Sequence, residues 1–350
     1  LAWVLVDMGS KPTERGDELF VYCAAGMRVP MEQAVAEYER EFGVPVRLTF
    51  DGSNTLLSSI AAHGRGDLFL AADDFYIESG RERGLIQEVL PLATMKPVIA
   101  VQKGNPKNIT GIDDLFRDDV KTALGNPEQA AVGKAAKKLL TASGHWEKLE
   151  KHVTANGVFE PTVPAVANAV KVGAIDAGII WDTTAKTISG LDYVTAPELD
   201  PGVAEVTLGV LSSSQRPTNA LHFARYVASR DKGLLAFAEH GWDVVDGDVW
   251  TDKPELTFYC GSVNRRAVEP VIEEFQKREG VVVNTVYNGC GILVAQMRTI
   301  LNQEQGKGFP DTYMACDVYY LDAVKELFQD AVNVSDTDVV IAVPKGNPKK

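Results

Sequence analysis

The residues best suited to chemistry in this sequence are small or hydroxyl-bearing ones at the starts of predicted helices. Gly26 follows one predicted strand, and Ser53 with Asn54 follows another. Thr162 precedes a third predicted helix. Helix starts carry unpaired N–H groups and a positive partial charge, so several of them together bind anions. The pattern predicts a site for a small anion.

The overall charge constrains how such a site works. The chain of 350 residues has a net charge of −13 at pH 7, which repels anions at long range. Capture must therefore depend on local dipoles. Neutral donors also avoid burying an ammonium group, which is costly. Ser53 and Thr55 offer hydroxyls, and Trp181 offers an indole N–H with no acceptor.

Each of these residues also has a purely structural interpretation. Ser53, Asn54 and Thr162 are typical helix N-caps. Gly26 suits a tight turn from strand to helix. Trp181 suits the core at the end of a strand. The sequence leaves both interpretations open.

A metal site is the alternative chemistry. Asp73 follows a predicted strand and Tyr76 lies three residues later. Carboxylate and phenolate oxygens are hard ligands that suit a cation such as ferric iron. The competing interpretation is a turn aspartate followed by a core aromatic residue.

No residue set predicts catalysis or a bound cofactor. The five histidines are not paired, and no nucleophile–base set or phosphate-loop glycine pattern is present. We therefore expect no enzyme activity and no cofactor. The net charge also argues against nucleic acid and against docking on an anionic membrane. No apolar run of about 18 residues predicts a membrane span.

The four cysteines form no metal-binding pattern. Each lies near the end of a predicted strand, so buried free thiols are the first expectation. A bridge between two of Cys260, Cys290 and Cys316 is the alternative in an oxidising compartment.

The sequence repeats itself. Residues 18–57 align without a gap on residues 255–294, so that Cys23 falls on Cys260. Further on, 67–76 matches 311–320, and "VIAVQKGNPKN" at 98–108 matches "VIAVPKGNPKK" at 340–350. So long a period predicts a duplicated domain.

Strands and helices alternate within the first copy. Residues 19–25, 44–50, 67–72 and 97–101 are apolar enough to be strands. Met31, Tyr38 and Phe42 lie on one face of a helix that Gly43 ends. Such alternation predicts parallel sheets covered by helices, with ligands at the carboxyl ends of the strands.

The first copy resembles the periplasmic binding proteins of molybdate/tungstate ABC importers. The resemblance lies in "VYCAAGM", "TFDGSNTL", "ALGNPEQAAVG" and "VKVGAIDAGIIWDTTA", and it covers nearly all of 18–242. The opening of the second copy, "LTFYCGSVNRRAVEP", also resembles ferric-iron carriers.

The resemblance implies a tetrahedral oxyanion held by five segments. Two departures from the family pattern affect how the pocket discriminates among anions, because Gly26 replaces a serine and Trp181 replaces a tyrosine. In the second copy, the corresponding candidates are Val263, Cys290 and Asp317. The implied ligand-binding residues of the first copy are Gly26, Met27, Ser53, Asn54, Val132, Thr162, Val163 and Trp181.

The fold implied is α/β and two-lobed, of the type 2 periplasmic-binding-protein kind, followed by a partial second copy. Residues 98–108 are expected to form the hinge strand between the lobes. The expected domains are a lead or anchor remnant at 1–16, a complete module at 17–246 (lobe one about 17–98 and 200–246, lobe two about 99–199), a linker at 247–254, and a first-lobe part of a second module at 255–350.

The function implied is capture of an oxyanion such as molybdate or tungstate for an ABC permease, outside the cytoplasm. Two alternatives are a ferric-iron carrier and a sensory or scaffolding module. Because the second copy stops at 350, we expect the natural chain to continue. Self-association through the partial copy is also expected.

Overall fold

The computed structural model describes residues 18–303 and 308–335. They form two compact units. The first unit ends at Asp252 and also includes Arg278–Gly280; the second contains Lys253–Lys277 and resumes at Val281. None of the described helices is long and apolar enough to cross a membrane.

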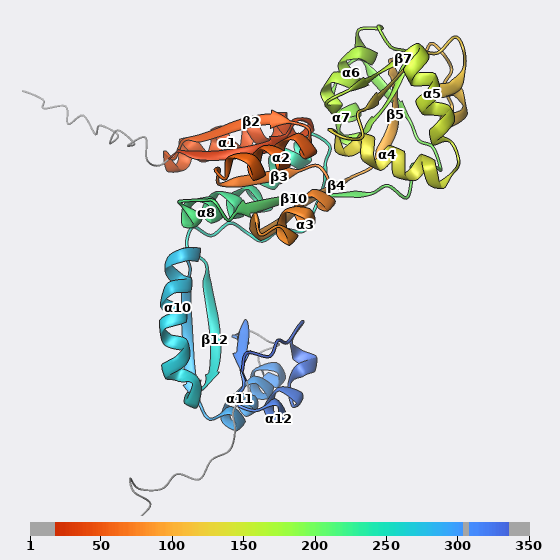
Figure 1. Cartoon of the computed structure of the whole chain (residues 1–350). Coiled ribbons are helices and arrows are strands. Elements are labelled where there is room, and N and C mark those ends of the chain that lie inside the picture. The colour runs from red at the N-terminus through yellow and green to blue at the C-terminus, as the bar shows by residue number, and fades with distance from the viewer. Residues whose placement is uncertain (1–17, 304–307, 336–350) are drawn as a thin grey trace, which may run out of the picture. The chain divides into compact units, whose positions relative to one another are not determined.

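The first lobe of the first unit contains a six-stranded sheet (Figure 1). Its strand order is β11-β4-β10-β3-β1-β2. Three of the four strands predicted from the alternating pattern, β1, β2 and β3, are parallel in this sheet, whereas β10 runs antiparallel to β3 and β4. The fourth, at 97–101, pairs antiparallel in the other sheet, so the prediction of parallel pairing is wrong there. The strands are β1 (Leu19–Ala24), β2 (Val46–Asp51), β3 (Leu68–Ala71), β4 (Ile86–Met95), β10 (Ala204–Leu211) and β11 (Asp243–Val244).

Helices cover this sheet and start where its strands end. The predicted helix that ends at Gly43 is confirmed, because Gly43 has φ 68° and its N–H bonds the carbonyl of Glu39. Met31 and Tyr38 are buried on one side of this helix, where the Tyr38 ring packs against Phe223 of α8. The helices are η1 (Ala25–Met27), α1 (Arg28–Phe42), α2 (Ser53–His63), α3 (Asp74–Glu82), α8 (Pro217–Val227) and α9 (Gly233–Glu239).

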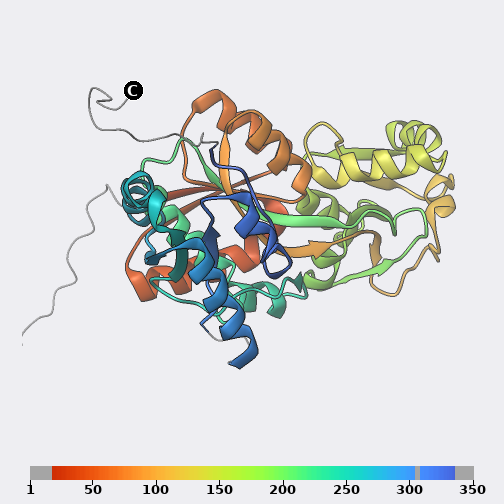
Figure 2. The ribbon, with the colours of Figure 1, turned by 90° about the horizontal axis from the view of Figure 1, so that it is seen from below.

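The second lobe has its own five-stranded sheet, in the order β7-β6-β8-β5-β9. The two lobes and their separate sheets can be followed in Figures 1 and 2. Its elements are β5 (Pro97–Gln102), η2 (Ile112–Phe116), β6 (Thr122–Gly125), α4 (Ala131–Ala142), α5 (Trp146–Asn156), β7 (Gly157–Glu160), α6 (Val163–Lys171), β8 (Ala177–Trp181), α7 (Asp182–Thr187) and β9 (Leu191–Val194).

The chain crosses between the lobes at Lys96, between β4 and β5. The Asp182 side chain accepts a bond from the Lys96 N–H at 2.9 Å, and the Asp182 N–H donates to the Lys96 carbonyl at 2.9 Å. The prediction that residues 98–108 form the hinge strand is wrong. Residues 97–102 pair on both edges within the second sheet, because their apolar side chains are buried there.

The second unit repeats the opening topology of the first. Its sheet order, β13-β12-β14, corresponds to β2-β1-β3. Its elements are β12 (Glu255–Gly261), η3 (Ser262–Asn264), α10 (Arg265–Glu279), β13 (Val282–Asn288), α11 (Cys290–Gln303), β14 (Thr312–Met314), α12 (Val318–Asp322) and η4 (Lys325–Leu327).

The strand registers also correspond. Leu19 lies opposite Val46 in the first unit, and Leu256 lies opposite Val283 in the second. These are the residue pairs that the aligned sequence repeat equates. The repeat at 340–350 lies outside the described residues, as does the predicted lead at 1–16.

The cysteines correct the first sequence expectation. Cys290 and Cys316 form a disulfide, whereas Cys23 and Cys260 are buried free thiols. Free thiols were therefore the wrong prediction for Cys290 and Cys316, and the alternative of a bridge among the last three cysteines is correct. The physical reason is that the fold brings the start of α11 to the segment after β14. The Cα atoms of Cys290 and Cys316 are 6.7 Å apart.

Candidate functional site

A small cavity lies between the two lobes of the first unit. Its volume is about 20 Å³, counted as space open to the centre of a water-sized sphere. This exceeds the minimum for one water and suits a small ion, not a larger organic molecule. It is lined by Ala24, Ala25, Gly26, Asp51, Gly52, Ser53, Ala72, Ala130, Ala131, Thr162, Val163 and Trp181.

Most of this lining consists of helix starts. Helix α2 begins at Ser53, α4 at Ala131 and α6 at Val163. The short η1 and α7 begin beside the cavity at Ala25 and Asp182. The side chains at the caps of α2, α4 and α6 make no capping hydrogen bond. The first N–H groups of a helix have no intrahelical acceptor, so those without another partner can donate to a bound anion. Here the Asn54 N–H already bonds the Gln129 carbonyl, and Pro164 in α6 has no N–H.

Ser53 adds a hydroxyl donor. Its side chain is 1% exposed, and its oxygen accepts a hydrogen bond from the N–H of Ala72 at 3.1 Å. Because that bond uses the oxygen as an acceptor, the hydroxyl hydrogen remains able to donate. The predicted N-cap role is wrong for Ser53 and Asn54, since the cap is Gly52 and Ser53 is the first helical residue.

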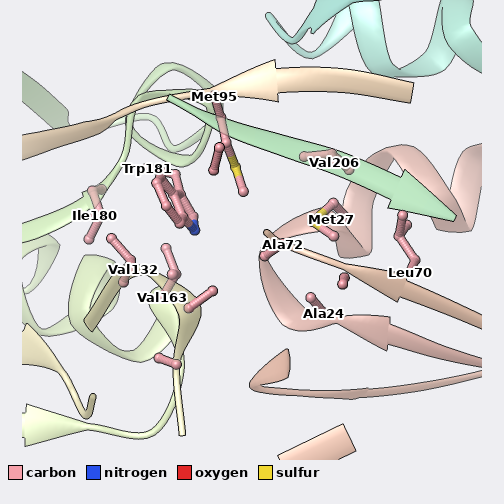
Figure 3. Close-up of a cluster of buried hydrophobic side chains, with 14 of the residues drawn as sticks. Ala24, Met27, Leu70, Ala72, Met95, Val132, Val163, Ile180, Trp181 and Val206 are labelled. Atoms are coloured by element: carbon pink, nitrogen blue, oxygen red, sulfur yellow. The ribbon is translucent and has the colours of Figure 1, made fainter. Parts of the chain in front are cut away.

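Trp181 supplies a second buried donor. It is 1% exposed, and its indole nitrogen has no hydrogen-bond partner among the described residues. Figure 3 shows this nitrogen pointing from the second lobe toward the first. Thr184 also has a buried hydroxyl without a partner, 3.7 Å from where a Cβ on Gly26 would lie. Unpartnered buried donors are costly unless a ligand accepts from them.

The cavity lining contains no lysine, arginine or histidine among the described residues. Its one ionisable residue is Asp51, whose side chain accepts from the N–H of Gly52 at 2.7 Å. Attraction for an anion must therefore come from peptide dipoles and neutral donors, and the Asp51 carboxylate opposes it. This arrangement is suited to stabilising negative charge without burying a cation.

The lobes touch beside the cavity. The Asn54 side chain donates to the Glu128 carbonyl at 2.6 Å, and its N–H donates to the Gln129 carbonyl at 3.3 Å. Gly52 packs so closely that an added Cβ would lie 2.3 Å from the Gln129 carbonyl oxygen. The Lys134 ammonium of the second lobe also lies 3.1 Å from the ring centroid of Phe75 in the first. These contacts hold the two lobes closed over the cavity.

The structure brings together five of the eight predicted residues: Gly26, Ser53, Thr162, Val163 and Trp181 line the cavity. Met27, Asn54 and Val132 lie outside its lining. Met27 and Val132 are fully buried in the core, and Asn54 bridges the lobes. Thr162 occupies the predicted cap position without a side-chain cap bond.

Sequence reasoning missed seven lining residues. Gly52 was available as a signal, since a glycine between a strand and a helix permits close approach of another backbone. The alanines carry no polar signal, because they contribute only their backbone. The missed residues are Ala24, Ala25, Asp51, Gly52, Ala72, Ala130 and Ala131.

The residues of the metal alternative lie outside the cavity lining. Asp73 caps α3 by accepting from the N–H of Phe75 at 2.9 Å, and burial raises its pKa to about 6. Tyr76 is buried, its hydroxyl has no partner, and burial raises its pKa. No group of three or more His, Cys, Asp or Glu side chains suited to a metal occurs in 18–303 and 308–335.

The three candidates of the second unit have different surroundings. Val263 is 78% exposed. Cys290 is bonded to Cys316, and Asp317 caps α12 by accepting from the N–H of Tyr319 at 2.8 Å. Asp317 thus repeats the capping role of Asp73.

The sequence model of one family matches most of the chain. It is described as bacterial extracellular solute-binding protein, and it matches residues 19–243 and again 256–350. The second matched range begins close to residue 255, where the aligned sequence repeat begins again.

Individual relatives match about one copy. The molybdate-binding protein ModA of Mycobacterium tuberculosis is 27% identical over 222 residues, which are 62% of this chain and 82% of that protein. ModA of Escherichia coli is 25% identical over 209 residues, which are 57% of this chain and 80% of that protein.

Solved structures show the same fold. The Azotobacter vinelandii periplasmic molybdate-binding protein has a TM-score of 0.56 at 17% identity, covering 64% of this chain and 98% of its own. The sulfate-binding protein SubI of M. tuberculosis has a TM-score of 0.56 at 15% identity, covering 80% and 98%. Iron-bound HitA of Pseudomonas aeruginosa has a TM-score of 0.52 at 16% identity, covering 67% and 94%. The fold is therefore the two-lobed type 2 periplasmic-binding-protein fold.

Proposed function

This chain belongs to the bacterial extracellular solute-binding protein family, and we propose that its first unit binds a tetrahedral oxyanion of the molybdate or tungstate type between its lobes. The observation that carries the proposal is the cavity itself. Helix starts from both lobes meet there around two buried neutral donors, Ser53 and Trp181, with no cationic side chain in the lining.

Hydrogen bonds from neutral donors are strong enough to account for micromolar binding of an anion. A hydrogen bond to a charged group contributes about 1.5–3 kcal/mol. Micromolar affinity corresponds to about 8 kcal/mol, so a handful of well-aimed donors exceeds it before the cost of immobilising the ion. The remaining N–H groups at the starts of α2, α4 and α6 would supply that number together with Ser53 and Trp181. The Asn54 N–H is not among them because it bonds the Gln129 carbonyl, and Pro164 has no N–H.

The ligand would be delivered to an ABC permease outside the cytoplasm. The lobes are joined by only a few crossing segments, so opening about the Lys96 crossing would admit the ion. Release would then require breaking the Asn54 contacts with residues 128 and 129. The family and the ModA relatives support a role in binding and transport, not catalysis.

We also propose that the second unit is a partial tandem copy of the first. The two ranges that match one family, the common sheet order and the matching registers support this origin. Self-association through the second unit stays a prediction.

The alternatives predict different results. A ferric carrier would use Asp73 and Tyr76, yet these lie outside the cavity lining and Asp73 already serves as a helix cap. A sensory or scaffolding module would keep the fold without delivering its ligand. Neighbouring genes for a permease and an ATPase would favour transport over that role.

Titration calorimetry with molybdate, tungstate, sulfate and phosphate tests the proposal. We expect saturable heat with at least one anion at one ion per first unit. Ser58→Ala is a suitable control, because Ser58 is exposed on the same helix as Ser53. No heat with any of the four anions would refute the proposal. A tyrosinate-to-iron absorption band on adding ferric iron would favour the carrier alternative instead.

A further inference from the structure

The disulfide of the second unit stands where the first unit has its anion-binding hydroxyl. Cys290 opens α11 as Ser53 opens α2. The Cys316 N–H donates to the Cys290 sulfur at 3.2 Å, as the Ala72 N–H donates to the Ser53 oxygen at 3.1 Å. Two positions that line the cavity in the first unit are thus joined covalently in the second.

The two cysteine residues differ in exposure to solvent. Cys290 is 4% exposed, whereas Cys316 is an exposed residue. The free thiols are both fully buried, and burial raises the pKa of Cys260 to about 11 and that of Cys23 further. An external thiolate therefore meets only one accessible cysteine in the described residues, Cys316. Exposed disulfides are the ones that exchange readily.

The buried sulfur is the better leaving group. Cys290 is the first residue of a 14-residue helix. A thiolate at a helix N-terminus is stabilised by the helix dipole, which lowers its pKa to below about 7.5 in known cases. A thiol of lower pKa leaves faster from a disulfide. The exposure of Cys316 and the leaving ability of Cys290 thus both favour attack at the sulfur of Cys316.

One carboxylate and two phenols of the described residues lie near this pair. Asp317 follows Cys316 directly, but its carboxylate is engaged by the N–H of Tyr319 at 2.8 Å. The Tyr313 hydroxyl, on β14, donates to the Cys290 carbonyl at 3.5 Å. The Tyr320 ring, on α12, lies 3.5 Å from where a Cβ on Gly291 would be. Asp317 opposes a Cys290 thiolate, and the helix start favours it.

We propose that Cys290 and Cys316 form a thiol–disulfide exchange site, in which a dithiol attacks the sulfur of Cys316 and Cys290 leaves as a thiolate. The reagent's first sulfur bonds to Cys316 while the Cys290–Cys316 bond breaks, and its electron pair goes to Cys290. The reagent's second sulfur then displaces Cys316. The dithiol is oxidised to a cyclic disulfide, the protein is reduced by two electrons, and the two reagent protons pass to the released sulfurs or to solvent.

Native-state labelling tests accessibility. The full chain is treated with dithiothreitol at pH 8 without denaturant, alkylated with iodoacetamide and analysed by peptide mass spectrometry. We expect Cys290 and Cys316 to be alkylated at least ~100-fold faster than Cys23 and Cys260, the internal controls, whose burial protects them. Reduction that occurs only after unfolding, or equal labelling of all four cysteines, would overturn the proposal.

The direction of attack is tested by the pH dependence of alkylation. In Cys316→Ala, the Cys290 thiol should be alkylated with a midpoint below about 7.5, whereas in Cys290→Ser the Cys316 thiol should have a midpoint near 8.5. Should either variant lose its circular dichroism spectrum, the same midpoints are read residue by residue in the reduced natural chain. A Cys290 midpoint at or above that of Cys316 would contradict the proposed direction. No oxyanion is present in these experiments, so their outcome does not depend on the first unit's ligand.

Discussion

Residues 53 and 290 occupy the same place in two similar frameworks and have different chemistry. Each is the first residue of the helix that follows the second strand, and each accepts a hydrogen bond from the segment after the third strand. In the first unit the acceptor is a hydroxyl that can still donate to an anion. In the second unit it is a sulfur already bonded to Cys316.

The frameworks agree in detail around this difference. Arg28 stacks 3.8 Å from the Phe50 ring centroid and pairs with Glu32, while Arg265 lies 5.0 Å from the Tyr287 ring centroid and pairs with Glu269. These arginines begin helices but are held on the surface by rings and carboxylates. Scaffold contacts and site chemistry can therefore change independently. Two residues, at 290 and 316, suffice to place a covalent bond where the first unit has the hydroxyl proposed to bind an anion.

The sharpest contrast is at the glycine before each helix. Gly52→Ala would place a Cβ 2.3 Å from the backbone oxygen of Gln129, although its φ of −67° suits alanine. We expect anion affinity to fall about 100-fold, since the lobes can no longer close. In Gly289→Ala the nearest atom is the Ile292 Cδ1 at 3.8 Å, an ordinary contact. By calorimetry, Gly289→Ala should bind the anion as tightly as the natural chain does. An equal loss of affinity in both variants would contradict the difference between the two glycines.

Trp181→Phe removes a donor that has no counterpart among the described residues of the second unit. We expect affinity for the anion to fall ~10–100-fold, because a hydrogen bond to a charge contributes about 1.5–3 kcal/mol. Stability in denaturant should also fall, because the smaller phenyl ring leaves a cavity at this buried site. Trp146→Phe, in α5 of the same lobe, is the control. An unchanged dissociation constant for Trp181→Phe would assign that side chain to the core alone.

Ser53→Ala replaces the hydroxyl that accepts a hydrogen bond from the Ala72 N–H with a hydrogen, leaving only a methyl side chain. We expect about a 10-fold loss of affinity, together with about 1–3 kcal/mol lower stability, because the Ala72 N–H is left unpaired. Ser58→Ala should change neither quantity. Both are measured by calorimetry and by denaturant unfolding. A loss of stability without a loss of affinity would mean that Ser53 positions Ala72 and does not bind the ligand.

The pH dependence of stability compares Asp73 with Asp317, the aspartates that cap corresponding helices in the two units. Burial raises the pKa of Asp73 to about 6, so the folded state holds its proton more tightly than the unfolded chain. Its contribution to stability is therefore lost as pH rises from about 4 to about 6. Asp73→Asn keeps a capping oxygen and should be more stable than the natural chain by ~1 kcal/mol at pH 8, with no gain at pH 4. Asp317→Asn, at the corresponding exposed cap, is the matched control in denaturant unfolding. If Asp73→Asn were more stable than the natural chain by the same amount at both pH values, burial of the charged carboxylate would not be the cause.

Local signals in the sequence predicted several elements well. The helix that ends at Gly43 and the strand at 97–102 follow from glycine at a left-handed cap and from an apolar run. The strand β4 and the helix α5 were not predicted. β4 contains Pro91 and no clean alternation, and its place in the sheet depends on antiparallel pairing with β10, more than 100 residues away.

The sequence by itself determined the repeated framework, the helix starts and the absence of a charged binding cluster. These properties depend on residues close together in the chain, where periodicity, caps and glycine conformations act. The tertiary structure decided which backbone groups meet: the alanines at 72, 130 and 131 enter the cavity lining, whereas Asn54 bridges the lobes. It also decided that Cys290 pairs with Cys316, because only folding brings the start of α11 to the end of β14. Contacts between distant segments depend on how whole elements pack, and no local pattern encodes that packing.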